Sequence, residues 1–161
     1  MVSYEAMTGN KGWFSLTPAL SYGKYLMMIV GPRSVGKSVS TAIYVLKKYI
    51  DSGRKFIYVR RTKDTLELTA ADWFTSAVQI LKDNGYVFAF DYDAKNYYID
   101  RGKGKEHCGY ALPLNAQQKV KGKDFSDADF IIFDEFIAFD GERYLGSKAN
   151  PIAEYKALIS L

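Results

Sequence analysis

Apolar residues of this chain gather in short continuous runs and in stretches with helical spacing. Continuous runs occupy residues 24–30, 55–59 and 129–136, and such runs are typical of strands that are buried on both faces of a sheet. From Lys37 onward apolar residues recur with the period of a helix, until the sequence Asp-Ser-Gly at 51–53 predicts its end. The apolar positions of this predicted helix are Val39, Ile43, Leu46 and Ile50.

A second helix is predicted over residues 68–85, where Asn84-Gly85 provides a stop. Its apolar face would consist of Ala70, Trp73, Phe74, Ala77, Val78 and Leu81. The two ends of the chain differ from this regular part. Residues 1–19 contain several glycine and proline breakers and are predicted to be loop-like. Residues 151–161 have an apolar pattern suited to a helix.

Three short segments between the second helix and the last strand have the character of an antiparallel meander. They are residues 86–90, 96–100 and 109–114, joined by turn-rich sequences. The strand–helix–strand order around them predicts an α/β fold, in which helices flank a parallel sheet that carries the inserted meander. In such sheets ligands bind beyond the carboxyl ends of the strands.

The sequence "GPRSVGKS" lies at such a position, between the first predicted strand and the first helix. It fits the phosphate-loop pattern G-x-x-x-x-G-K-[ST] without a mismatch. Backbone N–H groups of such a loop converge on phosphate oxygens, and the following helix adds its positive N-terminal end. We expect the loop to bind ATP with Mg²⁺, Lys37 contacting the β- and γ-phosphates and Ser38 ligating the metal. The nucleotide-binding residues would be Gly31, Pro32, Arg33, Ser34, Val35, Gly36, Lys37 and Ser38.

Two carboxylates, Asp134 and Glu135, follow the apolar run "DFIIF". Asp134 can hold Mg²⁺ through water, as a Walker B aspartate does. Glu135 can orient the attacking water or accept its proton. The adjacent pair therefore favours a hydrolase over a small-molecule kinase, although a solvated strand end is the simpler interpretation of Glu135 taken alone.

Several other residues have two interpretations that the sequence leaves open. Arg33 can contact the γ-phosphate or a neighbouring subunit, or it can be solvated. Tyr22 can stack on adenine or belong to the core. Arg60 and Arg61 follow a predicted strand and can contact ATP, a neighbour or DNA, or can lie on the surface. The basic segment 101–105 can contact nucleic acid or form a simple turn.

Composition narrows the function classes only moderately. The chain has 161 residues, which suits one domain, and a net charge of +4, which is compatible with a polyanionic partner. Its one cysteine, Cys108, excludes an intramolecular disulfide, and together with His107 it cannot form a structural zinc site. No apolar run approaches the about 20 residues of a membrane span, and the N-terminus lacks a signal-peptide layout. We therefore expect a cytosolic protein without a membrane partner. A GTPase is disfavoured because an Asn-Lys-x-Asp motif is absent from the sequence.

Four segments taken together carry a resemblance: "IVGPRSVGKS", "KFIYVRR", "NYYID…GYALPLN" and "IIFDEFI". In this order they resemble the genome-packaging ATPases of small tailed phages, the phi-twenty-nine-like group, from about Ser21 to the C-terminus. The resemblance implies a P-loop ATPase of the additional-strand, catalytic-glutamate class. Such proteins form a homo-oligomeric ring, usually a pentamer, on the portal of an empty capsid and drive double-stranded DNA inward, and a structural RNA helps attach the ring. It also implies a location in the host-cell cytoplasm, transiently on the procapsid and not in the mature virion.

The same resemblance assigns roles to individual residues. It makes Gly31, Gly36, Lys37 and Ser38 the Walker A loop, Asp134 the Walker B aspartate and Glu135 the catalytic base. The segment "KVKGK" at 119–123 lies where the family carries residues that face the neighbouring subunit, so Lys121 is a candidate for action in trans; a solvated loop is the alternative.

The sequence departs from the family after the carboxylate pair. The family's sensor strand, the region of its arginine finger and its nuclease-like C-terminal domain have no counterpart before Leu161. Residues 1–161 are therefore expected to be a C-terminally truncated ATPase domain. Arg33 and Arg143 are the resident arginines that can replace a finger. The competing interpretations are another ring-forming P-loop ATPase, such as a helicase or secretion motor, and a nucleotide-gated binding module.

Overall fold

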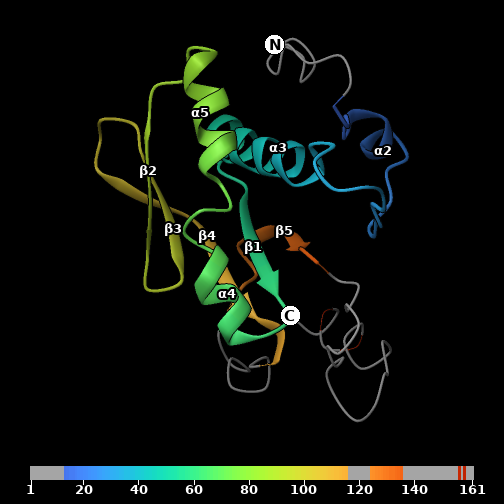
Figure 1. Ribbon diagram of the computed structural model, residues 1–161. Coiled ribbons are helices and arrows are strands. Elements are labelled where there is room, and N and C mark those ends of the chain that lie inside the picture. Colours follow the sequence, from blue (N-terminus) through green and yellow to red (C-terminus); the bar gives the residue numbers. More distant parts are fainter. Residues whose placement is uncertain (1–12, 116–123, 136–155, 157, 159–161) are drawn as a thin grey trace.

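The computed structural model describes residues 13–115, 124–135, 156 and 158, and its centre is a mixed sheet of five strands in the order β2-β3-β4-β1-β5 (Figure 1). β1 pairs in parallel with both β4 and β5, whereas β2, β3 and β4 form an antiparallel meander. The prediction of parallel strands with an inserted meander is therefore confirmed. The strands are β1 (Lys55–Arg60), β2 (Ala89–Asp93), β3 (Asn96–Asp100), β4 (Lys105–Pro113) and β5 (Ala128–Phe133).

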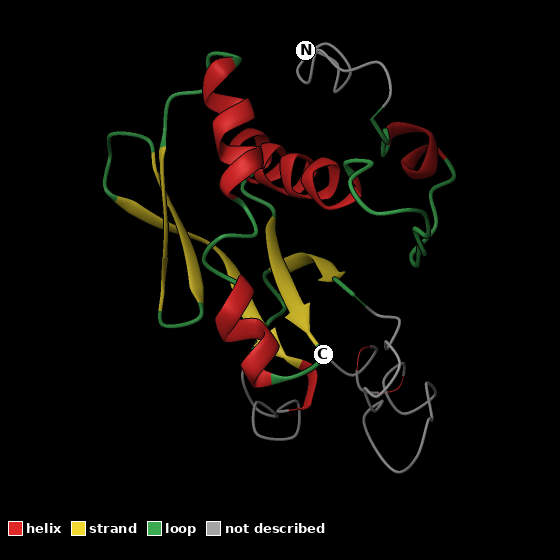
Figure 2. Ribbon diagram, viewed as in Figure 1, coloured by secondary structure: helices red, strands yellow, loops and turns green. Residues whose placement is uncertain are grey.

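Helices cover the sheet, and α3 and α5 lie beside each other (Figure 2). The helices are α2 (Thr17–Ser21), α3 (Lys37–Ser52), α4 (Lys63–Thr69) and α5 (Thr75–Asp83). α3 confirms the predicted first helix. It ends at Gly53, whose φ of 71° is left-handed and whose N–H donates to the Tyr49 carbonyl oxygen at 2.8 Å. This is the common glycine-terminated helix end.

Side chains of β1 alternate between two apolar clusters, so that the strand is buried on both faces as predicted. Phe56 and Tyr58 pack with residues of α3, α4 and α5. Ile57 and Val59 face the other side and pack with Leu112, Leu114 and Phe125. None of the helices in the described part of the chain is both long and apolar enough to span a bilayer.

The single helix predicted over residues 68–85 is wrong, because the chain forms two helices separated by a turn. α4 begins earlier than predicted, at a capping box in which the Thr62 and Thr65 side chains each accept a hydrogen bond from the other residue's N–H. At the turn after α4 the Trp73 ring lies 4.6 Å from Tyr58, and Phe74 lies 5.0 Å from Phe56. Burial of these large rings against β1 favours the turn over a continuous helix.

The strand predicted over residues 24–30 is also wrong. These residues are neither helical nor in a strand, and Tyr25, Leu26, Met28 and Val30 are each more than half exposed. Within the described part of the chain β5 pairs with β1 and with no other strand, so its other edge is left unpaired, and residues 24–30 do not form a strand against it. The preceding segment, predicted to be loop-like, contains the short helix α2.

Smaller differences concern the ends of elements. β2 begins at Ala89, later than the predicted segment 86–90, and β5 ends at Phe133, so that Asp134 and Glu135 follow the strand. Residue 136 lies outside the described residues, as does most of the helix predicted over 151–161. Of that helix, Lys156 and Leu158 are described and both are helical.

Candidate nucleotide site

The phosphate loop leads directly into the first turn of α3. Two of its residues have left-handed backbone conformations, Ser34 with a φ of 63° and Gly36 with a φ of 84°. Gly36 is the N-cap of α3, a helix of 16 residues. Alternation of left-handed and right-handed residues turns successive N–H groups toward one point, and the helix adds its positive end there. The local backbone therefore suits an anion such as a phosphate.

Lys37 and Ser38 occupy the start of this helix. The Lys37 ammonium donates to the Gly31 carbonyl oxygen at 2.8 Å and also to the Pro32 carbonyl oxygen, so the side chain folds back across the loop. Ser38 is exposed. The charged amine and the exposed Ser38 side chain thus both belong to the first turn of α3, where a bound polyphosphate would need them.

An aromatic residue that sequence analysis did not single out packs on the loop. The Phe14 N–H donates to the Val35 carbonyl oxygen at 2.8 Å, and this contact brings the preceding Trp13 onto Gly36. A Cβ at Gly36 would lie 3.0 Å from the Trp13 ring. Tyr22, the predicted adenine-stacking residue, is 74% exposed at the end of α2, and its contact with adenine stays a prediction.

The carboxylate pair lies at the carboxyl end of β5. The Asp134 N–H donates to the Val59 carbonyl oxygen at 3.2 Å, which continues the pairing with β1 beyond the strand. Glu135 then adopts a φ of 54°. This left-handed conformation is uncommon for a residue other than glycine, asparagine or aspartate, and such residues concentrate at functional sites.

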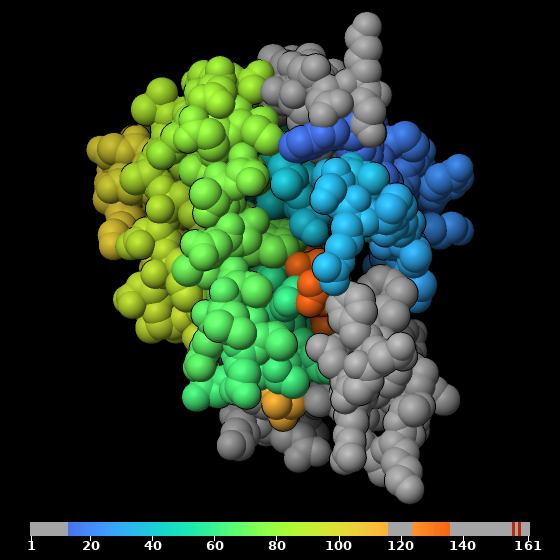
Figure 3. All heavy atoms as spheres, viewed as in Figure 1, coloured from blue at the N-terminus to red at the C-terminus, as the bar shows by residue number. Residues whose placement is uncertain are grey.

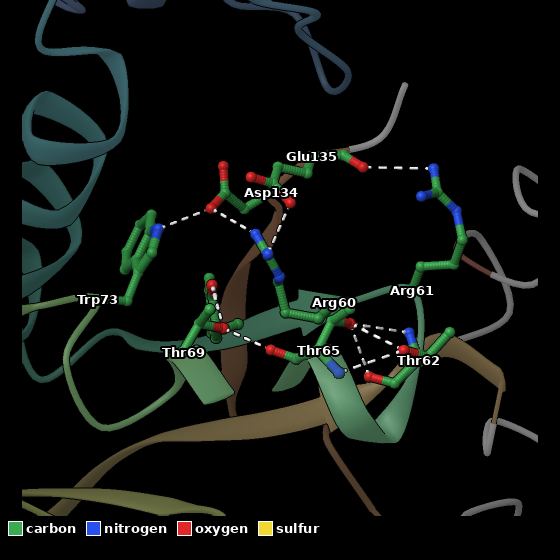
Figure 4. Close-up of polar contacts among 9 residues, drawn as sticks. Arg60, Arg61, Thr62, Thr65, Thr69, Trp73, Asp134 and Glu135 are labelled. Carbon is green, nitrogen blue, oxygen red and sulfur yellow. Dashed lines mark hydrogen bonds and ion pairs between the residues drawn. The ribbon is translucent and has the colours of Figure 1, made fainter. Parts of the chain in front are cut away.

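Side chains of Arg60 and Trp73 hold the two carboxylates, and Arg61 holds the backbone next to them (Figure 4). Arg60 donates to Asp134 Oδ2 through Nη1 at 2.9 Å and to Glu135 Oε2 through Nη2 at 2.7 Å. The Trp73 indole Nε1–H donates to the same Asp134 Oδ2 at 2.9 Å. Arg61 adds a hydrogen bond from Nη2 to the Glu135 carbonyl oxygen at 3.3 Å. The carboxylates are therefore bound to β1 and to the turn between α4 and α5.

Arg60 and Arg61 are buried, which excludes the surface interpretation of these two residues. The Arg60 side chain is 7% exposed, compared with 23% for Asp134 and 50% for Glu135. The sequence carried a signal for this arrangement. Arg60 follows one predicted strand, Asp134 lies at the end of another, and parallel neighbours in a sheet end at the same edge. Trp73 gave no such signal, because its spacing placed it on the apolar face of a predicted helix.

The oxygen ligands available here suit Mg²⁺. The described residues contain no cluster of three or more histidine, cysteine, aspartate or glutamate side chains that could hold a metal alone. Mg²⁺ needs fewer protein ligands than that, since it retains waters and binds substrate phosphates. None of the contacts drawn in Figure 4 reaches the second Asp134 oxygen. That oxygen and the Ser38 hydroxyl fit the predicted Mg²⁺ ligands, although no contact described here joins Asp134 to Ser38.

The loop and the carboxylates share one face of the molecule. Two residues, Gly53 and Arg54, connect α3 to β1. The chain reverses there, so α3 starts on the side where β1 and its parallel neighbour β5 end. Figure 3 shows the orange atoms at the end of β5 on the same face as the light-blue atoms of the segment before α3.

The basic segment at 101–105 forms the turn from β3 into the start of β4, and two of its three basic residues pair with acids. Arg101 Nη2 lies 2.6 Å from Glu106 Oε2, and Lys105 Nζ lies 2.5 Å from Asp91 Oδ2. These hydrogen bonds raise the pKa of Arg101 and of Lys105. Pairing with acids favours the interpretation as a simple turn over that of a nucleic-acid contact.

The remaining predicted site residues lie in the phosphate loop, in β4 or outside the described residues. Arg33 is exposed in the phosphate loop. Lys119, Lys121, Lys123 and Arg143 lie outside the described residues. His107 and Cys108 are residues of β4, as predicted, and burial raises the pKa of the Cys108 thiol.

The five-stranded mixed sheet with its helices is the fold of the N-terminal domain of a packaging ATPase. The crystal structure of that domain of the DNA packaging ATPase from bacteriophage phi29 matches with a TM-score of 0.76 and 29% sequence identity, covering 91% of this chain and 69% of that one. The structure of the bacteriophage phi29 viral genome packaging motor assembly matches with a TM-score of 0.75, also at 29% identity, covering 94% of this chain and 42% of that one.

The chain belongs to the family of Podovirus DNA encapsidation proteins (Gp16), which it matches over residues 11–159. The DNA packaging protein of Bacillus phage phi29 is 32% identical over 134 residues, which are 83% of this chain and 38% of that protein. The DNA packaging protein of Bacillus phage B103 is 32% identical over 124 residues, which are 73% of this chain and 34% of that protein. The chain thus spans little more than a third of the length of these relatives.

Proposed function

We propose that this chain is the ATP-hydrolysing part of a motor that moves double-stranded viral DNA into an empty capsid. The observation that carries the proposal is the buried Arg60, which holds Asp134 and Glu135 at the sheet edge, on the face of the molecule that also carries the segment before α3 (Figure 3). Membership of the encapsidation family favours packaging over a helicase, a secretion motor or a nucleotide-gated binding module. The additional-strand, catalytic-glutamate class is part of this proposal.

The proposed reaction uses residues from both halves of the site. The loop 31–36 and the Lys37 amine bind the phosphates. Ser38 and Asp134 would hold Mg²⁺, which would neutralise charge on the phosphate oxygens. Glu135 accepts a proton from the attacking water. The water oxygen bonds to the γ-phosphorus while the bond to the bridging oxygen breaks, and ADP leaves with that electron pair. Glu135 is half exposed and accepts a hydrogen bond from Arg60 through one oxygen, which leaves the other accessible to water.

Two substitutions test this reaction. Glu135→Gln keeps the size of the side chain but cannot accept the proton, so it should retain Mg·ATP binding and lose most phosphate release. Lys37→Ala should weaken ATP binding itself. Native turnover by the Gln variant would contradict the assignment of the base, and native ATP affinity of the Ala variant would contradict the assignment of the loop.

DNA contact forms the second part of the proposal. Contacts should be to phosphates, through lysines such as Lys119, Lys121 and Lys123, so DNA affinity should fall steeply with salt. Each lysine removed should reduce the slope of log affinity against log salt by about one unit. Stimulation of hydrolysis that grows with DNA length would favour a translocating motor, and an affinity independent of salt would contradict the phosphate contacts.

Assembly forms the third part. We propose a homo-oligomeric ring, in the host-cell cytoplasm and transiently on the procapsid, attached to a portal with the help of a structural RNA. An arginine supplied by a neighbour in the ring accelerates phosphoryl transfer by about 10³–10⁵. The ATPase rate per chain should therefore rise with protein concentration. A rapid rate that is unchanged on dilution to monomer would contradict the action of one subunit on another.

A further inference from the structure

Trp73 makes a polar contact that its sequence position does not suggest. It lies in the turn between α4 and α5, and its indole Nε1–H donates to Asp134 Oδ2 at 2.9 Å, across 61 positions of sequence (Figure 4). The ring itself is held in place. It lies 4.6 Å from Tyr58 and 4.7 Å from Phe74, the latter in an edge-to-face arrangement, and the Trp73 N–H donates to the Thr69 carbonyl oxygen.

The same carboxylate oxygen accepts from Arg60 at 2.9 Å. A carboxylate on a short side chain turns readily about its last bond, so one donor leaves its plane free to rotate. Two donors from different elements, β1 and the α4–α5 turn, converge on Oδ2 and restrict that rotation. The second oxygen is thereby kept in one direction. Hydrogen bonds to metal-binding carboxylates generally set their orientation in this way.

We infer that Trp73 is a positioning residue for Asp134: its indole N–H orients the carboxylate so that the second oxygen is presented to the Mg²⁺ of a bound nucleotide. The inference rests on the proposed function, since it assumes that Asp134 faces that metal. It adds that the turn between α4 and α5, through one indole N–H, determines how strongly Mg²⁺ assists nucleotide binding.

The test compares two variants that each lose one hydrogen bond from the same aromatic cluster. Trp73→Phe keeps a ring for Tyr58 and Phe74 but loses the donor to Asp134. The matched control is Tyr97→Phe, which loses the bond from Tyr97 Oη to the Ala70 carbonyl oxygen at 2.9 Å, away from Asp134. Affinity for the fluorescent nucleotide mant-ADP is measured for the native 161-residue chain and both variants, once with excess Mg²⁺ and once with EDTA.

The native chain should bind mant-ADP more tightly with Mg²⁺ than with EDTA. Trp73→Phe should reduce the affinity in Mg²⁺ by about tenfold, the size typical of lost partners of metal ligands, and leave the affinity in EDTA unchanged. Tyr97→Phe should lower the melting temperature, but Mg²⁺ should still increase its affinity for mant-ADP as much as it does for the native chain. The inference is overturned if Mg²⁺ increases the affinity of Trp73→Phe for mant-ADP as much as that of the native chain. It is also overturned if Tyr97→Phe loses this increase to the same extent as Trp73→Phe.

A second measurement leaves Trp73 unchanged and so does not depend on the folding of a variant. The chain contains two tryptophans, so its ¹H–¹⁵N spectrum has two indole cross-peaks, and the peak that disappears in Trp13→Phe belongs to Trp13. The Trp73 peak should shift when Mg²⁺ is added to the chain saturated with ADP, and a stationary peak overturns the inference. If the native chain binds no nucleotide, the proposed function fails and the inference with it. If Mg²⁺ increases the nucleotide affinity of the native chain and Trp73→Phe retains this increase, only the inference fails.

Discussion

Replacement of Arg60 by methionine tests how the carboxylate pair is held. Methionine keeps most of the length of the side chain and removes its charge and its hydrogen bonds to Asp134 and Glu135. The variant leaves two carboxylates next to each other without their shared cation, so the free energy of unfolding should decrease. The decrease should be measurable in the chain without any nucleotide.

The size of this decrease lies between two limits. Removing one partner of a fully buried ion pair costs about 3–5 kcal/mol, and removing one from an exposed pair costs about 0.2–1 kcal/mol. Arg60 is buried, but the Asp134 side chain is 23% exposed and that of Glu135 is 50% exposed, so water relieves part of the loss. We therefore expect a loss of about 2 kcal/mol for Arg60→Met, which lowers the melting temperature of a chain of this size by about 6 °C.

Double-mutant cycles divide this loss between the two carboxylates. Arg60→Met is combined with Asp134→Asn in one cycle and with Glu135→Gln in the other, and each unfolding free energy is measured by urea titration followed by circular dichroism. The coupling to Asp134 should be about 2 kcal/mol, and that to the more exposed Glu135 should be below about 1 kcal/mol.

The control for these cycles is an arginine in an exposed pair. Arg54 Nε lies 4.0 Å from Asp129 Oδ1, and both side chains are well exposed. Arg54→Met should therefore change the unfolding free energy by less than about 0.5 kcal/mol. If Arg60→Met lost no more stability than Arg54→Met, burial of Arg60 would not determine the strength of its ion pairs. A stronger coupling of Arg60 to Glu135 than to Asp134 would contradict the same explanation.

Three further substitutions test the loop and the sheet by urea or thermal unfolding. Gly36→Ala should cost about 1–3 kcal/mol because its φ of 84° is unfavourable for alanine, and a neutral result would contradict that backbone conformation. Gly109→Ala should cost about 1–3 kcal/mol or more, because the new Cβ would lie 2.7 Å from the Phe56 ring and 2.8 Å from the Phe56 carbonyl oxygen; equal stability would contradict this close approach of β4 to β1. Asp127→Asn should cost about 1 kcal/mol at pH 7, because its carboxylate accepts from Lys55 Nζ at 2.6 Å but is 43% exposed and screened by water. The bond to Lys55 lowers the pKa of Asp127, so its contribution is present above the ordinary aspartate pKa of about 3.9 and is lost as pH falls through the lower folded value. The difference between native and Asp127→Asn chains should therefore disappear on acidification, and a constant difference would contradict the ionic contribution.

The parts of the fold that sequence analysis predicted correctly are those in which local pattern and burial agree. The run at 55–59 is buried on both faces as β1, and the helical period from Lys37 gives α3, which ends at Gly53. The antiparallel meander was recognisable because turn-rich segments separate its strands. In these segments each residue's local preference matches its place in the sheet or helix.

The parts that failed depend on contacts distant in sequence. The helical period continues through Ala70, Trp73 and Phe74, yet the chain turns there because the two rings pack on β1. Periodicity describes which residues prefer burial, but it does not indicate which surface buries them. The contact between Trp73 and Asp134 was unpredictable for the same reason, whereas the position of Arg60 followed from the common edge of parallel strands.

The segment 24–30 shows the limit of this kind of prediction most clearly. Its composition is that of a buried strand, and its length and position before the phosphate loop agree with that interpretation. A strand, however, is defined by hydrogen bonds to a neighbour, and hydropathy carries no information about whether a neighbour is available. In the described part of the chain β5 pairs with β1 alone, and Ile131 of β5 is 45% exposed. Most apolar residues of the segment are exposed as well, and Ile29 is partly buried. The apolar composition of 24–30 therefore reflects a requirement for burial that the described residues do not meet, while the phosphate loop that follows keeps its left-handed residues and its place at the start of α3.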